Sequence, residues 1–481
     1  MSSTAAQAAD HGPGAGHGPG TTGCDAAVPR TQGAGGPGTR GTARSGGAGR
    51  GAQDADRLWP VADHLDDILG KIRPLEPIEL PLLEAQGCVL VEDVTVPVAL
   101  PPFDNSSMDG YAVRTADVAA ASEREPAVLT VIGDVAAGSG EPPAVGPGEA
   151  ARIMTGAPLP PGAEAVVPVE WTDGGTGGGP ATAMRAHSAA PEGATGRVRV
   201  HRPVAAGAHV RARGSDVGAG ELALRAGTVL GPPQIALLAA IGRATVTVRP
   251  RPRVVVMSTG SELVPPGEAL APGRIHDSNS FQLTAAAREA GAIAYRAGAV
   301  ADDAATLRAA VEDQLIRADA IVTSGGVSVG AYDVVKEALG GDVEFRKVAM
   351  QPGKPQGFGR IGPDRVPLLA LPGNPVSAYV SFELFVRPVI RTLMGLPDVH
   401  RTTRRAVCAE AVTSSPRGRR QFLRGRYEPA AVPGEPGTVT PVGGAGSHLV
   451  AALAQANALI VVDEDTTAVA AGAEVDVVLL T

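Results

Sequence analysis

The sequence predicts a multidomain protein of the α/β plus β class, with a doubly wound domain between two β-rich regions. Its 481 residues exceed what one hydrophobic core supports, and about three domains are expected at this length. Strands and helices alternate from Arg253 to about Met394, the pattern of a parallel sheet with helices on both faces. Short strands separated by glycine and proline fill residues 126–210 and 402–481, which predicts a small β domain in each region.

Composition and charge argue against several classes of protein. No run of about 18 apolar residues occurs, so no transmembrane helix is expected, and the N-terminus lacks the basic and apolar segments of a secretory signal. Cys24, Cys88 and Cys408 lie far apart without CxxC spacing, which argues against a disulfide framework or zinc knuckle and favours a cytoplasmic location. A net charge of −8 makes nucleic-acid binding a poor expectation, although a locally positive pocket can still bind a small anion.

The N-terminal part is expected to change from disorder to mixed structure. Residues 1 to about 55 are rich in Gly, Ala, Pro, Ser and Thr and precede the first aromatic residue, Trp59, so we predict a disordered tail whose two histidines are inert. Three elements follow. They are a helix from Val61 to about Ile72 that stops before Pro74, a short helix from Leu80 to Gly87, and a strand from Cys88 to Val96.

The β-rich region and the segment after it show shorter patterns. Val128–Ile132 and Ala165–Val169 are expected strands, and Gly174–Pro180 is expected to be a hairpin or an insertion. Residues 233–241 predict a helix that ends at Gly242, a position suited to glycine.

The alternating region gives the clearest strand predictions. Leu307, Ala310, Val311 and Leu315 form one apolar helical face between two of these strands. The expected strands are Val254–Met257, Ala294–Val300, Ala320–Thr323, Val343–Val348 and Pro367–Leu371, and those of the C-terminal β domain include Leu459–Val462 and Val475–Leu480.

Three of these strands run directly into loops of glycine and small hydroxyl residues. The loops are Ser258–Glu262, Ser324–Gly330 and Pro372–Ser377, the last of which opens a helix over Ala378–Val386. Each loop alone can be a simple tight turn. Parallel sheets bind ligands beyond the carboxyl ends of their strands, and glycine lets backbone N–H groups approach an anion. Three such loops at one edge predict a phosphate or nucleotide site, although none has the spacing of a P-loop.

Further polar residues lie near this predicted site. Lys354, one of only four lysines, stands between Gly353 and Pro355 and suits an oxyanion, or is a solvated loop residue. Asp333 is close enough to the second loop to hold magnesium against a phosphate. Asp302 and Asp303 are candidate site acids or a helix N-cap. The segment 101–113 combines acids, an amide and hydroxyls with apolar anchors and predicts either a site or a structural turn.

Six motifs together resemble the molybdopterin molybdenumtransferase family, which includes bacterial MoeA proteins and the gephyrin E domain. They occur in the family's order and span roughly Trp59 to the C-terminus. The motifs are Pro-Phe-Asp-Asn-Ser-Ser-Met-Asp-Gly-Tyr-Ala (102–112), Ile-Met-Thr-Gly-Ala-Pro (153–158), Ser-Thr-Gly-Ser-Glu-Leu (258–263), Ser-Gly-Gly-Val-Ser-Val-Gly (324–330), Pro-Gly-Lys-Pro (352–355) and Leu-Pro-Gly-Asn-Pro-Val-Ser (371–377).

The resemblance implies an architecture of four domains after the tail, in an elongated homodimer. The active cleft would lie between the doubly wound domain of one subunit and the N-terminal domains of the other. The implied domains are an N-terminal α/β domain (56–120 and 211–248), a β-rich lid domain (121–210), a doubly wound, MogA-like molybdopterin-binding domain (249–398) and a small C-terminal β domain (399–481).

The resemblance also implies the reaction and its participants. Adenylylated molybdopterin and molybdate would give molybdenum cofactor and AMP with Mg²⁺, by attack of a molybdate oxygen on phosphorus or by displacement of the adenylate at the dithiolene. A molybdopterin adenylyltransferase would supply the substrate. Carried over by position, the catalytic residues are Asp109, Glu262, Asp302, Asp333 (also the metal ligand) and Lys354; the substrate-binding residues are Thr155, Thr259, Gly260, Ser324, Gly325, Gly326, Ser328, Pro372, Asn374 and Pro375; and the molybdate-binding residues are Lys354, Ser377, Arg419 and Ser447.

Two departures from the family pattern keep alternatives open. Many relatives have Asp where Ser261 stands and Lys where Gln351 stands, which allows a degenerate paralogue or a variant that handles tungstate. A non-catalytic scaffold is the alternative from another class, but retention of the acids and of Lys354 favours an enzyme. The upstream adenylyltransferase and CinA-type pyrophosphatases share the doubly wound domain but not the flanking domains.

Overall fold

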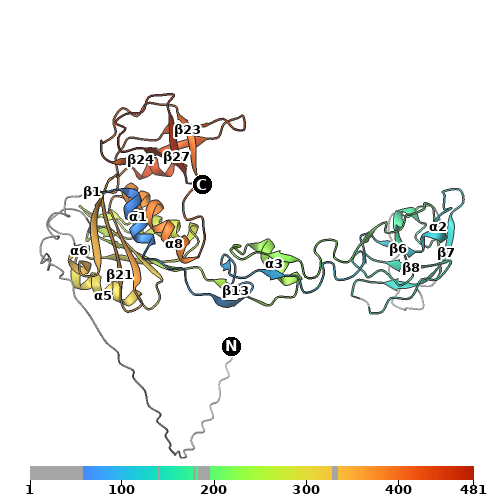
Figure 1. Cartoon of the computed structure of the whole chain (residues 1–481). Coiled ribbons are helices and arrows are strands. Elements are labelled where there is room, and N and C mark those ends of the chain that lie inside the picture. Colours follow the sequence, from blue (N-terminus) through green and yellow to red (C-terminus); the bar gives the residue numbers. More distant parts are fainter. Residues whose placement is uncertain (1–57, 139, 177–179, 182–195, 328–333, 481) are drawn as a thin grey trace, which may run out of the picture. The chain divides into compact units, whose positions relative to one another are not determined.

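The computed structural model describes residues 58–138, 140–176, 180–181, 196–327 and 334–480 (Figure 1). The expected tail, residues 1–55, and residues 177–179 of the expected hairpin lie outside the described residues. The chain divides into two units, of which the second, Gln53–Thr481, contains every described element.

A seven-stranded sheet forms the centre of the doubly wound domain. Its order is β1-β19-β21-β22-β18-β14-β17, and the last four strands are parallel. Because those four run in one direction, their carboxyl ends lie at one edge of the sheet. The strands are β1 (Leu58–Trp59), β14 (Arg253–Thr259), β17 (Ile293–Val300), β18 (Ala320–Ser324), β19 (Val343–Val348), β21 (Pro355–Ile361) and β22 (Val366–Leu371).

Strand β21 was not expected from the sequence and makes the sheet mixed. It runs antiparallel to both β19 and β22. It begins at a proline and contains Gly357 and Gly359, which are poor strand formers. Here the glycines allow close packing, because a Cβ on Gly359 would lie 2.1 Å from the carbonyl oxygen of Asp342. Tertiary packing therefore overrides local preference in this strand.

Helices cover both faces of this sheet, and alternate strand residues point to opposite faces. Val254 and Val256 of β14 pack against α4, α7, α8 and α1, whereas Val255 and Met257 pack against α5 and α6. The bounds are α1 (Val61–Leu69), α4 (Asn279–Glu289), α5 (Ala304–Gln314), α6 (Val334–Leu339), α7 (Pro375–Ser381), a π-helical segment (Phe382–Val386) and α8 (Arg387–Leu393).

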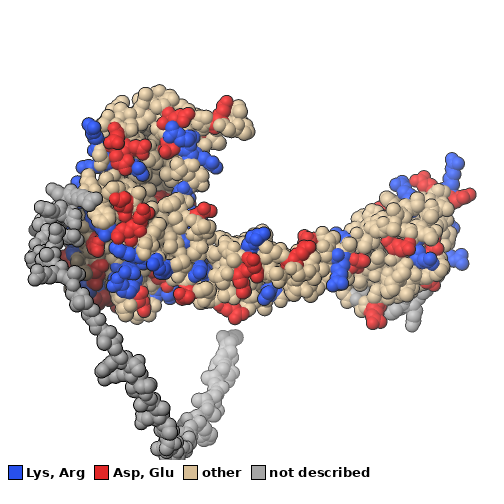
Figure 2. All heavy atoms as spheres, in the orientation of Figure 1, with Lys and Arg blue, Asp and Glu red and all other residues tan. Residues whose placement is uncertain are grey.

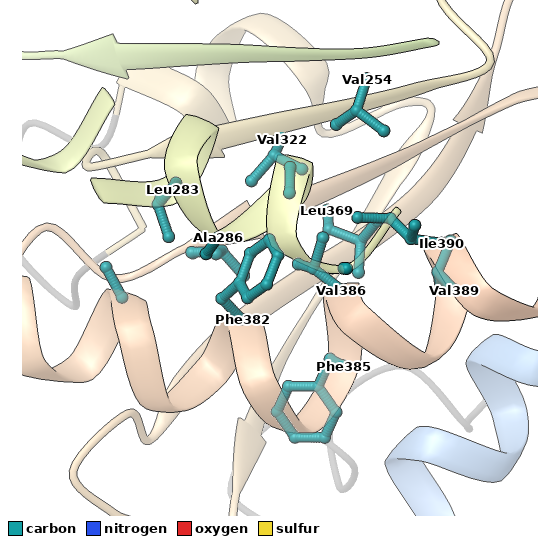
Figure 3. Close-up of a cluster of buried hydrophobic side chains, with 14 of the residues drawn as sticks. Val254, Leu283, Ala286, Val322, Leu369, Phe382, Phe385, Val386, Val389 and Ile390 are labelled. Carbon is teal, nitrogen blue, oxygen red and sulfur yellow. The ribbon is translucent and has the colours of Figure 1, made fainter. Parts of the chain in front are cut away.

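The helix expected over Ala378–Val386 is longer and is interrupted by the π-helical segment. Figure 3 shows Phe382 and Val386 directed toward the strand residues Val322 and Leu369, whereas Phe385 points away from them. The ring of Phe385 meets His64 of α1 edge-on, with centroids 4.9 Å apart. Burial lowers the pKa of His64 to about 4, so the imidazole is neutral between these helices at pH 7.

The N-terminal elements correct one prediction. Leu80 lies in a strand, β2 (Ile78–Pro81), followed by turns, so the helix expected over Leu80–Gly87 is wrong. Strand β2 pairs with β13 (Thr245–Arg249), which also pairs with β3 (Val89–Leu90). The expected strand Cys88–Val96 is two short strands, β3 and β4 (Val94–Thr95); β4 pairs with β12 (Leu222–Leu224), and α3 (Pro232–Ala240) forms as predicted.

The β-rich middle region forms one five-stranded sheet in the order β10-β7-β8-β6-β9. The chain enters and leaves it through β5 (Asn105–Ser106) and β11 (Val210–Arg211), which pair with each other. A short helix, α2 (Thr115–Val118), and a 3₁₀ turn, Val169–Trp171, accompany the sheet. Its strands are β6 (Gly110–Val113), β7 (Ala127–Val135), β8 (Glu149–Ile153), β9 (Ala165–Pro168) and β10 (Gly196–Val200).

The C-terminal region forms a six-stranded sheet that begins within the doubly wound domain. Strand β20 (Met350–Gln351) directly follows β19 in the chain and pairs with β24, so the two sheets are joined by a very short connection. The two strands predicted from the sequence correspond to β26 and β27. The remaining elements are β23 (Thr403–Cys408), β24 (Arg420–Glu428), β25 (Gly437–Pro441), α9 (Val450–Ala454), β26 (Ala458–Val462) and β27 (Glu474–Leu479).

The described surface carries mixed charge. On the face shown in Figure 2, acidic and basic side chains are interspersed over the described residues. None of the helices in the described ranges combines the length and apolar character needed to span a bilayer. Cys88 and Cys408 are both buried free thiols, and burial raises the pKa of each.

Candidate active site

A cavity of about 1150 Å³ opens at the carboxyl ends of β14, β18 and β22. All three glycine-rich loops predicted from the sequence contribute to its wall, together with the segment after β20. The predicted site residues that line it are Thr259, Gly260, Glu262, Asp302, Ser324, Gly325, Gly326, Pro372, Asn374, Pro375, Ser377 and Ser447.

Glycines let these loops pack directly on one another. Gly325 has φ +103°, and a Cβ there would lie 2.5 Å from the carbonyl oxygen of Thr259. The Cβ position of Gly373 lies only 3.4 Å from the Cα of Gly325. Loops after three neighbouring strands are therefore in close backbone contact, an arrangement that a side chain at Gly325 would prevent.

Asn279, the first residue of α4, connects two of the loops. Its Nδ2 donates to Ser324 Oγ at 2.8 Å and to the carbonyl oxygen of Gly373 at 2.7 Å. The α4 N-terminus is itself held by Asp277, which is 2% exposed and accepts hydrogen bonds from Ser258 Oγ at 2.8 Å and from the Ser280 N–H at 3.0 Å. This network links the three loops to one another through residues of the doubly wound domain.

Two neighbouring acids have different roles. Asp302 accepts a hydrogen bond from the Ser261 N–H at 2.8 Å, and its own N–H donates to Ser261 Oγ at 3.2 Å, so it ties the first loop to the end of β17. Asp303 caps α5 by accepting from the Thr306 N–H at 2.7 Å. Hydrogen bonds from Thr306 lower the pKa of Asp303. The N-cap role considered for this pair thus belongs to Asp303, whereas Asp302 lines the cavity.

The wall of the cavity is acidic. Glu262, Asp277, Asp302 and Glu337 contribute to it, and no lysine or arginine occurs among the described residues that line it. Its only basic side chains in the described ranges are the imidazoles of His276 and His448. An anionic ligand bound here would consequently need positive charge from a metal ion, from side chains at the rim or from another subunit.

The C-terminal domain contributes a second side of the cavity. The carbonyl oxygen of Ser447 accepts a hydrogen bond from the N–H of Val376, next to Ser377, at 3.0 Å. Ser377 and Ser447, predicted together as oxyanion ligands, are thus brought to one place. Lys354 and Arg419, predicted as their companions, are not among the described residues that line the cavity.

The remaining predicted residues fall elsewhere. Asp109 and Thr155 form a pair beside the five-stranded sheet, where the Thr155 N–H and hydroxyl donate to Asp109 Oδ1 at 2.7 and 3.0 Å. They do not line the cavity of the described chain. Ser328 and Asp333 lie outside the described residues. Across the described ranges, no group of three or more His, Cys, Asp and Glu residues has the geometry of a metal site.

Sequence reasoning missed part of the cavity wall. The polar run Asp277-Ser278-Asn279, which leads into the helix, is the usual N-terminal signal and would have marked the start of α4. Its contacts with the other loops were not visible in the sequence, because Asn279 bonds residues that are remote along the chain. The polar lining residues that were not predicted from the sequence are His276, Asp277, Ser278, Asn279, Glu337 and His448.

Three family models match successive parts of the chain. The MoeA N-terminal region (domains I and II) matches residues 59–242, a probable molybdopterin-binding domain matches residues 255–392, and the MoeA C-terminal region (domain IV) matches residues 405–480. The second match contains most of the cavity wall.

Relatives align along nearly the whole described chain. A protein named molybdopterin molybdenumtransferase 2 from Mycobacterium tuberculosis (strain ATCC 25618 / H37Rv) is 46% identical over 425 residues, covering 87% of this chain and 98% of that protein. A molybdopterin molybdenumtransferase from Bacillus subtilis is 36% identical and covers 81% of this chain and 87% of that protein. The crystal structure of a molybdopterin biosynthesis MoeA protein from Pyrococcus horikoshii has 32% identity and a TM-score of 0.67, covering 88% of this chain and all of that chain.

Proposed function

Because the chain belongs to the MoeA family of molybdopterin molybdenumtransferases, we propose that it inserts molybdate into adenylylated molybdopterin and releases AMP. In this function it is an enzyme of molybdenum cofactor biosynthesis. The three family models follow one another in order from residue 59 to residue 480, which supports the multidomain transferase over an isolated molybdopterin-binding domain.

The observation that carries the proposal is the cavity at the carboxyl edge of the parallel strands. Its volume, about 1150 Å³, slightly exceeds the range of about 300–1,000 Å³ common for small-molecule sites, as suits a pterin joined to a nucleotide. Three loops place backbone groups and the hydroxyls of Thr259 and Ser324 at this edge. Such donors stabilise a phosphate without bringing a flexible charged side chain into the site.

The acidic wall supports Mg²⁺ as the companion of an anionic substrate. Magnesium is usually held by one or two carboxylates together with substrate phosphates. Glu262 and Asp302 offer hard carboxylate oxygens in the cavity and fit this donor set. We assign Asp333, in the segment after Gly326, as a further metal ligand by position in the family motif. When bound, the ion supplies positive charge that offsets the charge of the phosphates.

Molybdate would bind where the doubly wound and C-terminal domains meet. Ser377 and Ser447 line the cavity there and can donate hydroxyl hydrogen bonds to an oxyanion. Lys354 lies in the segment Gln351–Pro355, whose other four residues all line the cavity, so its long side chain starts at the rim. Arg419 directly precedes β24. This strand pairs with β20, which ends at Gln351, the first residue of the segment that contains Lys354.

A second copy of the chain would complete the site. Asp109 and Thr155 carry family motifs but do not line the cavity of the chain that contains them. A homodimer in which one subunit presents this pair to the partner's cavity accounts for both facts. A molybdopterin adenylyltransferase is the proposed source of the substrate, and the cytoplasm the proposed location.

The test is to incubate the purified protein with adenylylated molybdopterin, Mg²⁺ and molybdate, and to follow AMP release and reconstitution of a molybdenum-free apoenzyme. Molybdate-dependent AMP release with reconstitution is the expected result. Substrate binding without turnover would instead identify a degenerate paralogue, and reversion of Ser261 to Asp and Gln351 to Lys would be the next experiment. Preferential turnover with tungstate would change the metal but keep the reaction.

A further inference from the structure

We propose that a second cavity, lined by Arg387, Arg391 and Arg401, binds a tetrahedral oxyanion such as phosphate or a phosphate monoester. This cavity has a volume of about 600 Å³ and shares no lining residue with the first. It is formed by α8, by the segment 397–402 that leads into the C-terminal domain, and by Leu479 near the end of β27.

Arg387 is the central observation. The residue is 9% exposed, and its Nε and one terminal nitrogen are fully buried without a hydrogen-bond partner. Its contact with an acid is long, because Nε lies 4.0 Å from Glu383 Oε2. A buried guanidinium with unpaired donors is costly, and such groups in native proteins are normally satisfied by a ligand, an ion or water.

The acid beside Arg387 is already used. Glu383 accepts hydrogen bonds from Arg401 Nε at 2.8 Å and from its Nη2 at 3.2 Å, and the side chain of Glu383 is only 1% exposed. Arg401 Nη2 also donates to Glu289 at 2.6 Å. Both carboxylate oxygens of Glu383 therefore serve Arg401, and Arg387 Nε, 4.0 Å from Oε2, is left without a hydrogen bond.

Among the described residues that line the cavity, no other side chain serves as a partner of Arg387. Nε of Arg391 donates to the backbone carbonyl of Asp398, and His400 is the remaining basic side chain of the wall. Within the described ranges Asp398 is the one acid that lines the cavity, and it lies on the 397–402 segment. Burial, then the charge of Arg401, lower the pKa of Arg387, as expected for a cation short of acceptors.

The backbone at this place is also unusual. Glu383 lies in the π-helical segment, and Arg387 is the first residue of α8 directly after it. Single π-helical turns cost hydrogen-bond geometry and are frequent at functional sites. Here the π turn sets the position of Arg387 relative to Glu383.

The chemistry points to an oxyanion. A guanidinium presents its donors in a planar fork that matches two oxygens of phosphate, sulfate or a carboxylate. The volume is within the range of sites for small organic molecules, which leaves room for a group attached to the phosphate. The competing interpretation is that Arg387 only forms a long structural ion pair with Glu383. The two interpretations differ in whether replacing Arg387 abolishes binding of an oxyanion.

The test compares the wild type with Arg387→Met and with a control, Arg405→Gln. Arg405 is an exposed arginine in ion pairs with Glu474 and Asp476, so its loss removes the same charge from outside the cavity. The melting temperature of each protein is measured in inorganic phosphate, in glucose 6-phosphate and in sodium chloride at equal ionic strength. Crystals of the wild type soaked in selenate locate the bound oxyanion by its anomalous signal.

The proposal predicts that phosphate raises the melting temperature of the wild type and of Arg405→Gln in a saturable way, beyond chloride. Arg387→Met should lose that increase, with the Kd raised at least about tenfold, a loss of 1.4 kcal/mol or more. Tighter binding of glucose 6-phosphate would identify a phosphate monoester, and equal binding a free oxyanion. An undiminished phosphate effect in Arg387→Met would overturn the proposal. If that variant fails to fold, a selenate map without a peak at Arg387 overturns it equally.

Discussion

The two cavities described above differ in the charge of their walls. The cavity at the strand ends is lined by four acids and, within the described ranges, by no lysine or arginine, whereas the cavity at α8 is lined by three arginines. In the first, the hydrogen-bond donors of the loops face four carboxylates, so a phosphate bound there needs additional positive charge from elsewhere. The second carries that charge on its own residues, two on α8 and one on the segment 397–402. We therefore propose that an anion in the first cavity depends on a metal ion or a partner for its positive charge, and that an anion in the second does not.

The largest expected effect is that of removing divalent metal. Chelation with excess EDTA should lower AMP release by about 1000-fold or more, because a bound metal ion supplies several kcal/mol of charge stabilisation. Phosphate binding at Arg387 should be unaffected by the same treatment. Undiminished AMP release in EDTA would show that the acidic wall does not work through a metal and would remove the contrast between the cavities.

The next effect concerns the stability of the second cavity. Arg401→Ala leaves Glu383 buried without its two hydrogen bonds and should lower the free energy of unfolding by about 3–5 kcal/mol. Arg387→Met removes a buried cation that lacks partners and should change it by less than about 1 kcal/mol, or increase it. Urea denaturation of both variants in chloride measures the difference. Equal losses would mean that Arg387 and Arg401 share Glu383 after all.

A smaller effect is expected from the backbone of the first cavity. Gly325→Ala combines a φ of +103° with a Cβ that would lie 2.5 Å from the Thr259 carbonyl, so the loop must shift at a cost of about 1–3 kcal/mol. We expect kcat/KM to fall about 10- to 100-fold. Gly341→Ala is the matched control, because a Cβ there meets nothing within 4 Å. An active Gly325→Ala enzyme would show that the loops need no backbone contact.

The smallest effect should follow loss of the connection made by Asn279. Asn279→Ala removes two hydrogen bonds between loops, and we expect kcat/KM to fall about tenfold while the fold is kept. Thr284→Val on the same helix is the control, since the buried hydroxyl of Thr284 has no hydrogen-bond partner. Matching losses in both variants would assign the effect to α4 packing and not to the loops.

The doubly wound domain was predictable because its strands are continuous apolar runs. Val254–Met257 and Ala320–Thr323 are buried on both faces, and such runs can hardly be placed anywhere but inside a parallel sheet. Strand β21 was not predicted because it contains glycines, which are poor strand formers. These glycines are needed for close packing, as between Gly359 and the carbonyl oxygen of Asp342. The segment Leu80–Gly87 was misassigned because Leu80 pairs with Val246, far along the chain.

The first cavity was predictable to the extent that it consists of strand ends. Loops that follow parallel strands meet at one edge whatever their side chains, so Thr259, Ser324 and Pro372 came together as expected. Asn279 and the second cavity were not predictable. Arg387 lacks a hydrogen-bond partner because Arg401 donates to both oxygens of Glu383. These contacts form only when the chain folds, so the sequence does not show them. The domain limits drawn from the sequence stay a prediction.

The insertion of the five-stranded sheet has a consequence for the order of events during synthesis. All its strands, from β6 to β10, emerge from the ribosome before β13, the common partner of β2 and β3. The inserted sheet can therefore fold while β2 and β3 are still unpaired, and the exposed edges of these two strands must wait for Thr245–Arg249. The length of the insertion therefore sets how long β2 and β3 stay unpaired on the ribosome. During that time they can pair with a wrong strand or be bound by a chaperone.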